Sequence, residues 1–196
     1  MKETIEKIQD WYKINCNDDW EHRYGYKIET LDNPGWAIKI DLTDTALNNL
    51  EFERKFQNPN NRDDWFNIQT ENRILFIHCG PENMKKVFEI FFDEIILEHS
   101  DSNFEYKVHL PISGFGIEIW TPAKSKLINE RTVQITEIEK IEYKNIKVRD
   151  TEYINFIPTD LEKLKLNYSV GDILEVELER IFGRTVLTAK SKKENG

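Results

Sequence analysis

The feature that most constrains this fold is an alternating sequence that begins near residue 20 and continues through residue 42. Polar and apolar side chains alternate on both sides of one turn, and aromatic residues recur throughout. A period of two is typical of β-strands, because successive side chains point to opposite faces of a sheet. In the turn, Asn33 precedes Pro34, which presets φ, and Gly35, which accepts positive φ, so a type II turn ending at Trp36 is predicted. The stretch therefore predicts a β-hairpin.

The whole first half predicts a compact α+β unit. Residues 3–15 and 82–97 place apolar side chains at helical spacing, and the second of these segments starts just after Gly80. The strands predicted between the two helices lie near 22–30, 36–42, 50–56, 65–68 and 73–79. This order indicates an antiparallel β-meander flanked by two helices.

The second half consists mainly of short predicted strands. They lie at 104–110, 115–120, 132–138, 140–149, 152–157, 172–181 and 184–190, with one or two helical turns at 160–166. Many short strands separated by turns are typical of a small barrel or sandwich. Residues 99–103 are polar and suit a linker. We therefore expect an α+β domain at 1–98 and a mostly β domain at 104–196.

Composition excludes several classes of protein. Of the 196 residues, 32% are charged and 39% are hydrophobic, as in a folded soluble protein. No apolar run approaches the ~20 residues that cross a bilayer, and the first residues contain no apolar signal segment. The two cysteines, Cys16 and Cys79, do not make a disulfide framework. We therefore expect a cytoplasmic protein with no membrane partner.

The net charge of −9 is distributed unevenly along the chain. Residues 1–98 contain 12 Lys and Arg against 20 Asp and Glu, a net charge of −8, whereas residues 99–196 contain 15 against 16. An acidic domain repels nucleic acid and attracts a basic partner. Solubility is the alternative explanation, since an acidic surface also keeps protein molecules apart.

The sequence gives little support to metal or catalytic chemistry. His78 and Cys79 are adjacent on a predicted strand, so they point to opposite faces and do not share one metal ion easily. The pairs Asp18-Asp19 and Asp63-Asp64 could serve acid–base catalysis beside His22, but Asp-Asp steps also suit turns. No nucleophile elbow or phosphate-binding loop accompanies them. We expect no metal, no cofactor and no enzymatic activity.

Nucleic-acid binding is the alternative for the second half. Seven Lys and Arg residues between 144 and 184 could line a small barrel that binds an oligonucleotide. Glutamates are interleaved among them and the half is close to neutral, which argues against a nucleic-acid partner. A nucleic-acid-binding or regulatory module in residues 104–196 therefore remains the second hypothesis.

Protein binding is favoured by the position of the tryptophans. Trp11, Trp20, Trp36 and Trp65 all lie in the acidic first domain. Aromatic side chains within a charged rim are typical of tight protein interfaces. We expect Trp11 and Trp36 to pack in the core. Trp20 and Trp65 each follow an acidic pair, and we expect them to be partly exposed.

Several motifs of the first domain occur together and indicate a family. They are Trp11-Tyr12, Cys16, Asp19-Trp20-Glu21-His22, Tyr24-Gly25, Ile28, the run from Thr30 to Trp36, Asp63-Asp64-Trp65 and Gly80-Pro81. In this combination, residues about 5–97 resemble the bacterial immunity protein 53 family. Residues 99–196 extend beyond the family domain and resemble no family that we can name.

The resemblance implies a function in toxin defence. Such proteins are encoded beside polymorphic toxins, so a cognate toxin is the implied partner. The acidic charge of the first domain suggests that this toxin has a basic surface and is a nuclease. The expected contact residues are Asp18, Asp19, Trp20, Glu21, His22, Asp63, Asp64 and Trp65. The residues expected to be structural are Gly25, Asn33, Pro34, Gly35, Trp36 and Gly80. The contact face and the oligomeric state stay open at this point.

Overall fold

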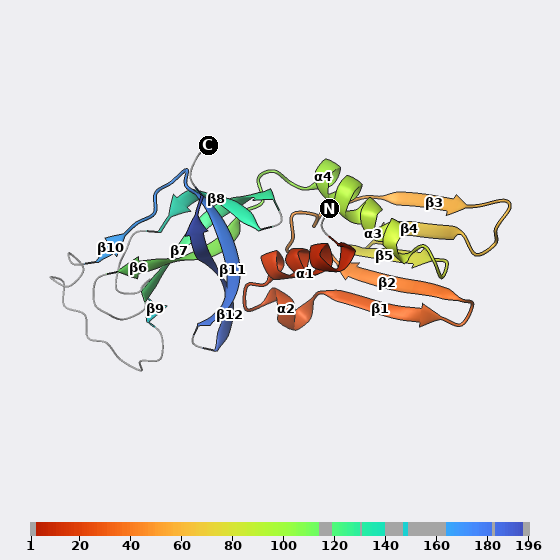
Figure 1. The fold of residues 1–196 in the computed structure, drawn as a ribbon, viewed down its shortest axis with the longest axis horizontal. Helices are drawn as coiled ribbons and strands as arrows, with labels where there is room; N and C mark the ends of the chain where they lie inside the picture. The colour runs from red at the N-terminus through yellow and green to blue at the C-terminus, as the bar shows by residue number, and fades with distance from the viewer. Residues whose placement is uncertain are drawn as a thin grey trace. The chain divides into compact units, whose positions relative to one another are not determined.

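A computed structural model describes residues 3–113, 119–129, 131–139, 147–148, 164–181 and 183–193. The chain forms two compact units (Figure 1). Unit 1 contains residues 1–9 and 20–104, and unit 2 contains residues 10–19 and 105–196. The first helix, α1 (Thr4–Asn15), therefore contributes its two halves to different units.

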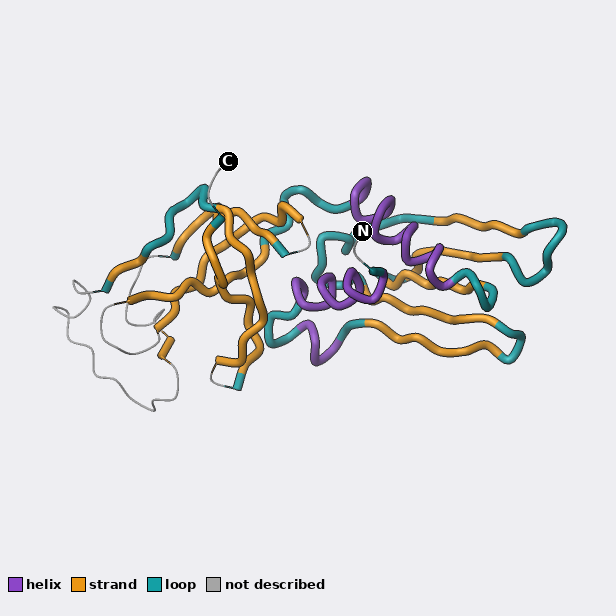
Figure 2. Tube along the Cα trace, viewed as in Figure 1, coloured by secondary structure: helices purple, strands orange, loops and turns teal. Residues whose placement is uncertain are grey.

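Unit 1 is built on a five-stranded antiparallel sheet with the order β1-β2-β5-β4-β3. The strands are β1 (Tyr26–Leu31), β2 (Gly35–Asp41), β3 (Glu53–Gln57), β4 (Trp65–Glu71) and β5 (Ile74–Cys79). The helices of this unit, besides the start of α1, are α2 (Trp20–Arg23), α3 (Met84–Ile90), the π-helix η1 (Phe91–Ile95) and α4 (Ile96–His99). Figure 2 shows α3, η1 and α4 as one continuous helical segment that crosses the strands.

The two faces of this sheet differ sharply in burial. In register across the sheet, Ile38 of β2, Ile77 of β5 and Ile68 of β4 form one row, and all three are at most 1% exposed. The side chains that alternate with them on the same strands are exposed or half-buried, apart from Ala37. The helical segment carries its own buried apolar residues, Val87, Phe88, Ile90, Phe91, Phe92 and Ile95. The core of unit 1 therefore lies between one face of the sheet and the helices.

Unit 2 contains a closed ring of strands. Its strands are β6 (Tyr106–Ser113), β7 (Ile119–Asn129), β8 (Thr132–Ile138), β9 (Lys147–Val148), β10 (Lys165–Leu166), β11 (Ile173–Ile181) and β12 (Arg184–Lys192). The ring runs β6-β7-β8-β11-β12 and closes because β12 pairs with β6. An up-and-down ring of five strands must bring its first and last strands together in parallel, and the β12–β6 pairing is parallel. The short strands β10 and β9 lie outside the ring, where they pair with β6 and β7.

Residues 10–19 are an integral part of unit 2. Asp10 is only 1% exposed, and its Oδ1 lies 2.9 Å from Nε of Arg131, which precedes β8. A cavity of about 260 Å³ lies beside this ion pair, between Ile14 of α1 and the β11–β12 hairpin. A buried carboxylate needs such a partner, because removing a charge from water is costly. The segment that precedes α2 is thus joined to strands more than a hundred residues away in the sequence.

The α+β class, the antiparallel sheet with its helices and the mostly β second half are confirmed. The first strand was predicted from about residue 22 but begins at Tyr26, because residues 20–23 form the helix α2. The prediction of a type II turn with positive φ at Gly35 is also wrong. Gly35 belongs to β2, its φ is not positive, and a three-residue turn precedes it. Residues 165–166 form a strand and not a helical turn. The strand predicted at 152–157 lies outside the described residues, as does most of the strand at 140–149.

The described part of the chain contains no helix that is both long enough and apolar enough to cross a membrane.

Candidate functional site

Two of the predicted structural motifs meet at one end of the five-stranded sheet. Trp36 is the second residue of β2, and Trp65 is the first residue of β4; both side chains are half-buried. Nε1 of Trp36 donates a hydrogen bond to the Pro81 carbonyl at 3.0 Å, and the Gly80 amide donates to the Trp65 carbonyl at 2.9 Å. We call this the tryptophan end: residues 32–36, 58–65 and 80–83.

Two glycines allow the backbones at the tryptophan end to approach closely. A Cβ atom at Gly80 would lie 1.8 Å from the Asp63 carbonyl oxygen, and a Cβ atom at Gly35 would lie 2.5 Å from the Cys79 carbonyl oxygen. Neither distance is compatible with a side chain unless the backbone shifts. Both glycines are therefore required for packing between loops and strands, and not for an unusual φ.

A carboxylate and two amides hold the loops of the tryptophan end together. Asn58 Nδ2 donates to one oxygen of Asp64, and Asn83 Nδ2 donates to the other, each at 2.8 Å. Asn83 Oδ1 in turn accepts from the Trp65 amide at 3.3 Å. The hydrogen bonds from Asn58 and Asn83 hold the pKa of the Asp64 carboxyl below its ordinary value, because they favour the ionised form. Asp64 therefore serves the fold, whereas its neighbour Asp63 is exposed.

The opposite end of the sheet carries the predicted residues of α2. Trp20 is 1% exposed, and its Nε1 donates to the Thr43 carbonyl at 2.9 Å. Glu21 is half-buried and His22 is exposed. The expectation that Trp20 is partly exposed is wrong, because Trp20 begins α2 and its indole is buried in the core. Gly25, with a φ of 137°, leads from α2 into β1 and accepts a hydrogen bond from the Asp41 amide.

A polar groove of about 820 Å³, which no sequence motif predicted, also lies at this end of the sheet. Its walls are the segment from Asn48 to Glu53 and the β4–β5 hairpin from Gln69 to Arg73. Thr70 holds the two walls together, because its Oγ1 accepts from the Phe52 amide at 2.8 Å. Glu51, Glu53 and Glu71 supply carboxylates along the groove, and Arg73 supplies one positive charge.

The predicted contact residues are therefore divided. Asp63, Asp64 and Trp65 lie at the tryptophan end, whereas Trp20, Glu21 and His22 lie at the end where β1 begins. The six residues of β5 separate the two ends by roughly 17–20 Å at about 3.3 Å per residue. No compact ligand of a few ångströms could contact both groups, so a surface that used both would have to follow the whole length of the sheet.

Asp18 and Asp19 belong to unit 2, although they directly precede α2. The Asp18 carboxylate lies 3.4 Å from Nε of Arg184 and accepts a hydrogen bond from the Thr185 amide at 3.3 Å. Asp18 also has a φ of 75°, which Asp tolerates better than most residues. These contacts hold Asp18 against the β11–β12 hairpin. Arg184, one of the basic residues considered for nucleic-acid binding, is used in this contact; Lys144, Arg149 and Lys163 lie outside the described residues.

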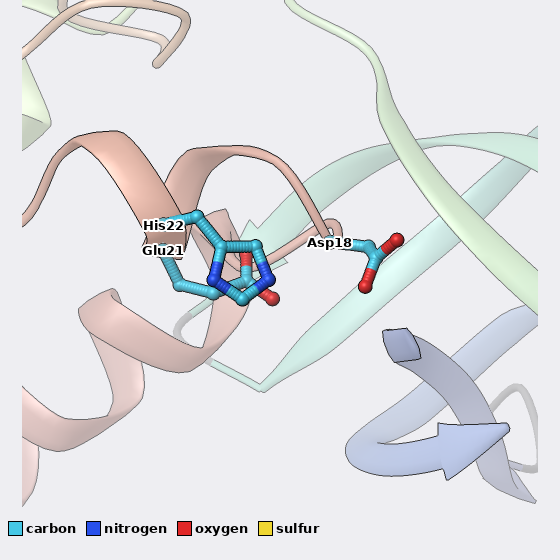
Figure 3. A group of neighbouring side chains, drawn as sticks. All are labelled: Asp18, Glu21 and His22. Carbon is cyan, nitrogen blue, oxygen red and sulfur yellow. The ribbon is translucent and has the colours of Figure 1, made fainter. Parts of the chain in front are cut away.

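Among the described residues, one group of side chains offers donor atoms for a metal ion. Asp18, Glu21 and His22 are near neighbours along the chain and each offers one donor atom (Figure 3). Exposed acidic groups commonly lie together without an ion, so these three residues do not define a metal site. Cys79 is fully buried while His78 is half-buried on the other face of β5. Burial raises the pKa of the Cys79 thiol to about 11, which makes this thiol a poor nucleophile at neutral pH.

Comparison with known proteins bears on this arrangement. Residues 5–96 match the family model Immunity protein 53. The resemblance predicted for residues about 5–97 is thereby confirmed, and the C-terminal half has no family match. No curated protein and no solved structure matches the chain. The match includes all the motifs that meet at the tryptophan end.

Proposed function

We propose that this protein binds and neutralises a cognate bacterial toxin as a stoichiometric inhibitor and is not an enzyme. The match of residues 5–96 to the immunity protein 53 family carries this proposal, because the family name denotes proteins that protect against a toxin. The acidic character of unit 1 supports it. Unit 1 contains 11 Lys and Arg against 18 Asp and Glu, a net charge of −7, whereas unit 2 has a net charge of −2.

The tryptophan end is the contact surface that we propose for the toxin. Its loops carry the exposed residues Asp32, Asp63 and Glu82, and the half-buried Trp36 and Trp65 lie where β2 and β4 begin, on opposite faces of the sheet. Aromatic residues within a charged rim are typical of energetically important interface positions. The close backbone contacts and the Asp64 hydrogen bonds already order these loops, so binding would lose little conformational entropy there.

This proposal narrows the set of contact residues expected from the sequence. Trp20 is excluded as a contact because its side chain is buried, and Asp64 acts indirectly by ordering the loop that carries Asp63. Asp18, Asp19, Glu21 and His22 lie elsewhere and are proposed at most as a secondary contact. The proposed contact residues are therefore Asp63 and Trp65 from the sequence prediction, together with Asp32 and Glu82.

The charge of unit 1 indicates the chemistry of the toxin surface. A net charge of −7 would attract a basic surface over long range and accelerate association, and added salt would weaken this effect. A toxin that cuts DNA or RNA has such a basic surface, because it must bind the phosphates of its substrate. We therefore propose further that the toxin is a nuclease.

The test pairs the full chain with a candidate toxin, namely the C-terminal domain of any large secreted protein whose gene neighbours the gene of this chain. Co-expression should restore growth of cells that produce the toxin domain, and calorimetry should give one inhibitor per toxin. Asp63→Lys should weaken binding by about tenfold or more, because it places a like charge against a basic surface.

Glu71→Lys is the matched control, since it makes the same charge change at the opposite end of the sheet. It should alter the association rate slightly and the dissociation rate very little. Normal binding by Asp63→Lys together with weak binding by Glu71→Lys would move the contact surface to the polar groove. No binding and no protection by the unmodified chain would disprove the proposed function.

A further inference from the structure

On the face of the five-stranded sheet opposite the helices, the central strand β5 carries apolar and aromatic side chains. β5 directs Leu75, Ile77 and Cys79 into the core and Ile74, Phe76 and His78 to the other face, where all three are half-buried. A solvated sheet face normally carries polar residues. Here the middle of the face is apolar and aromatic, and the helical segment of unit 1 packs on the other side.

The strand register places two ordered rows of side chains across this face. One row runs Lys27, Lys39, Phe76, Gln69 and Glu53 from β1 to β3. The next row runs Glu29, Ala37, His78, Asn67 and Lys55. The charges on the two edge strands are therefore opposite in each row, and these four edge residues are exposed.

This pattern is complementary to itself. A two-fold axis that runs along β5 would place β1 of one molecule opposite β3 of a second molecule and keep each row in line. Lys27 would then face Glu53 of the second copy, and Glu29 would face Lys55. Phe76 would face its own counterpart at the centre. Symmetric dimers use the same patch twice, so a self-complementary patch is what such an interface requires.

We propose that this protein forms a symmetric homodimer through the open face of the five-stranded sheet. Five strands about 4.8 Å apart and about 20 Å long give a face of roughly 500 Å², or about 1,000 Å² for both copies. That area lies at the lower limit of specific interfaces, so the dimer is weak and its population depends on protein concentration. Two such faces pack about 10 Å apart, a distance that the Lys and Glu side chains span together.

Sedimentation of the full chain over a range of concentrations tests the proposal. The mass should rise from 23.4 kDa to twice that value as concentration increases. Phe76→Asp should abolish the rise, because two carboxylates would meet at the axis. Leu97→Asp is the matched control: Leu97 is 76% exposed on α4, and its replacement should leave the dimer intact. A single mass of 23.4 kDa at all concentrations would overturn the proposal, as would a dimer that survives Phe76→Asp.

Charge reversal tests the arrangement of the two copies. Glu29→Lys should weaken the dimer by about tenfold, because two like-charged pairs replace two opposite pairs. Adding Lys55→Glu to the same chain should restore the affinity, which also shows that the first variant is folded. Rescue by Lys27→Glu instead of Lys55→Glu would overturn the proposed axis.

Discussion

The two ends of the five-stranded sheet are built in opposite ways. The tryptophan end is held by backbone contacts at Gly35 and Gly80 and by the hydrogen bonds of Asp64. The other end is held by the buried indole of Trp20 and keeps an open groove beside it. Similar sequence motifs thus have different roles. The tryptophan after one acidic pair is a core residue, whereas the tryptophan after the other remains half-buried at a rigid surface.

The largest expected loss of stability is at the end of the sheet that Trp20 holds together. Trp20→Ala should lower the free energy of unfolding by about 3–5 kcal/mol, because it leaves a cavity and an unpaired carbonyl at Thr43. Urea denaturation measures this loss. Trp20→Phe keeps most of the ring volume and should cost much less. Equal costs for the two replacements would show that packing of the indole does not hold this end.

Gly80→Ala should have the next largest effect, at the tryptophan end. The added Cβ atom would overlap the Asp63 carbonyl, so a loss of about 3 kcal/mol is expected from the forced backbone shift. Gly183→Ala is the comparison: it has open space around it and a φ of +74°, so only the roughly 1–2 kcal/mol cost of left-handed backbone is expected. A smaller loss for Gly80→Ala than for Gly183→Ala would contradict the close approach.

The smallest effect is expected for Asp64→Asn, and it should depend on pH. The folded protein holds the pKa of Asp64 below its ordinary value of 3.8, so ionised Asp64 adds stability above that pH. This stability is lost as the pH falls through the folded-state pKa. Asp64→Asn should therefore lower Tm at neutral pH, and the difference from the unmodified protein should shrink below pH 3.8.

Asp63→Asn is the control for this pH dependence, because its exposed side chain lies one residue away without the two amide donors. At each pH from neutral to acidic, the Asp63→Asn variant should have the same Tm as the unmodified protein. A similar pH-dependent loss in both variants would mean that general acidity of the loop, and not the hydrogen bonds from Asn58 and Asn83, stabilises the tryptophan end.

The candidate site was only partly visible from the sequence. The motifs that contain Asp63, Trp65 and Gly80 are recognisable in the sequence, because they consist of residue types that turns and strand starts require. Their association with Asn58 and Asn83 is not recognisable, since no local pattern connects side chains that lie 25 residues apart. The polar groove had no signal either, because its walls are polar loops that resemble any solvated connection.

Local periodicity was sufficient for most of the described strands and for the two long helical segments of the first half, because alternation and helical spacing depend only on neighbouring residues. It determined the α+β class, the hairpin before residue 42 and the mostly β second half. Tertiary structure decided what periodicity could not. It made residues 20–23 a helix so that Trp20 could be buried, and it joined residues 10–19 to unit 2 through Asp10 and Arg131. Burial and charge pairing depend on distant partners, and only the folded chain brings those partners together.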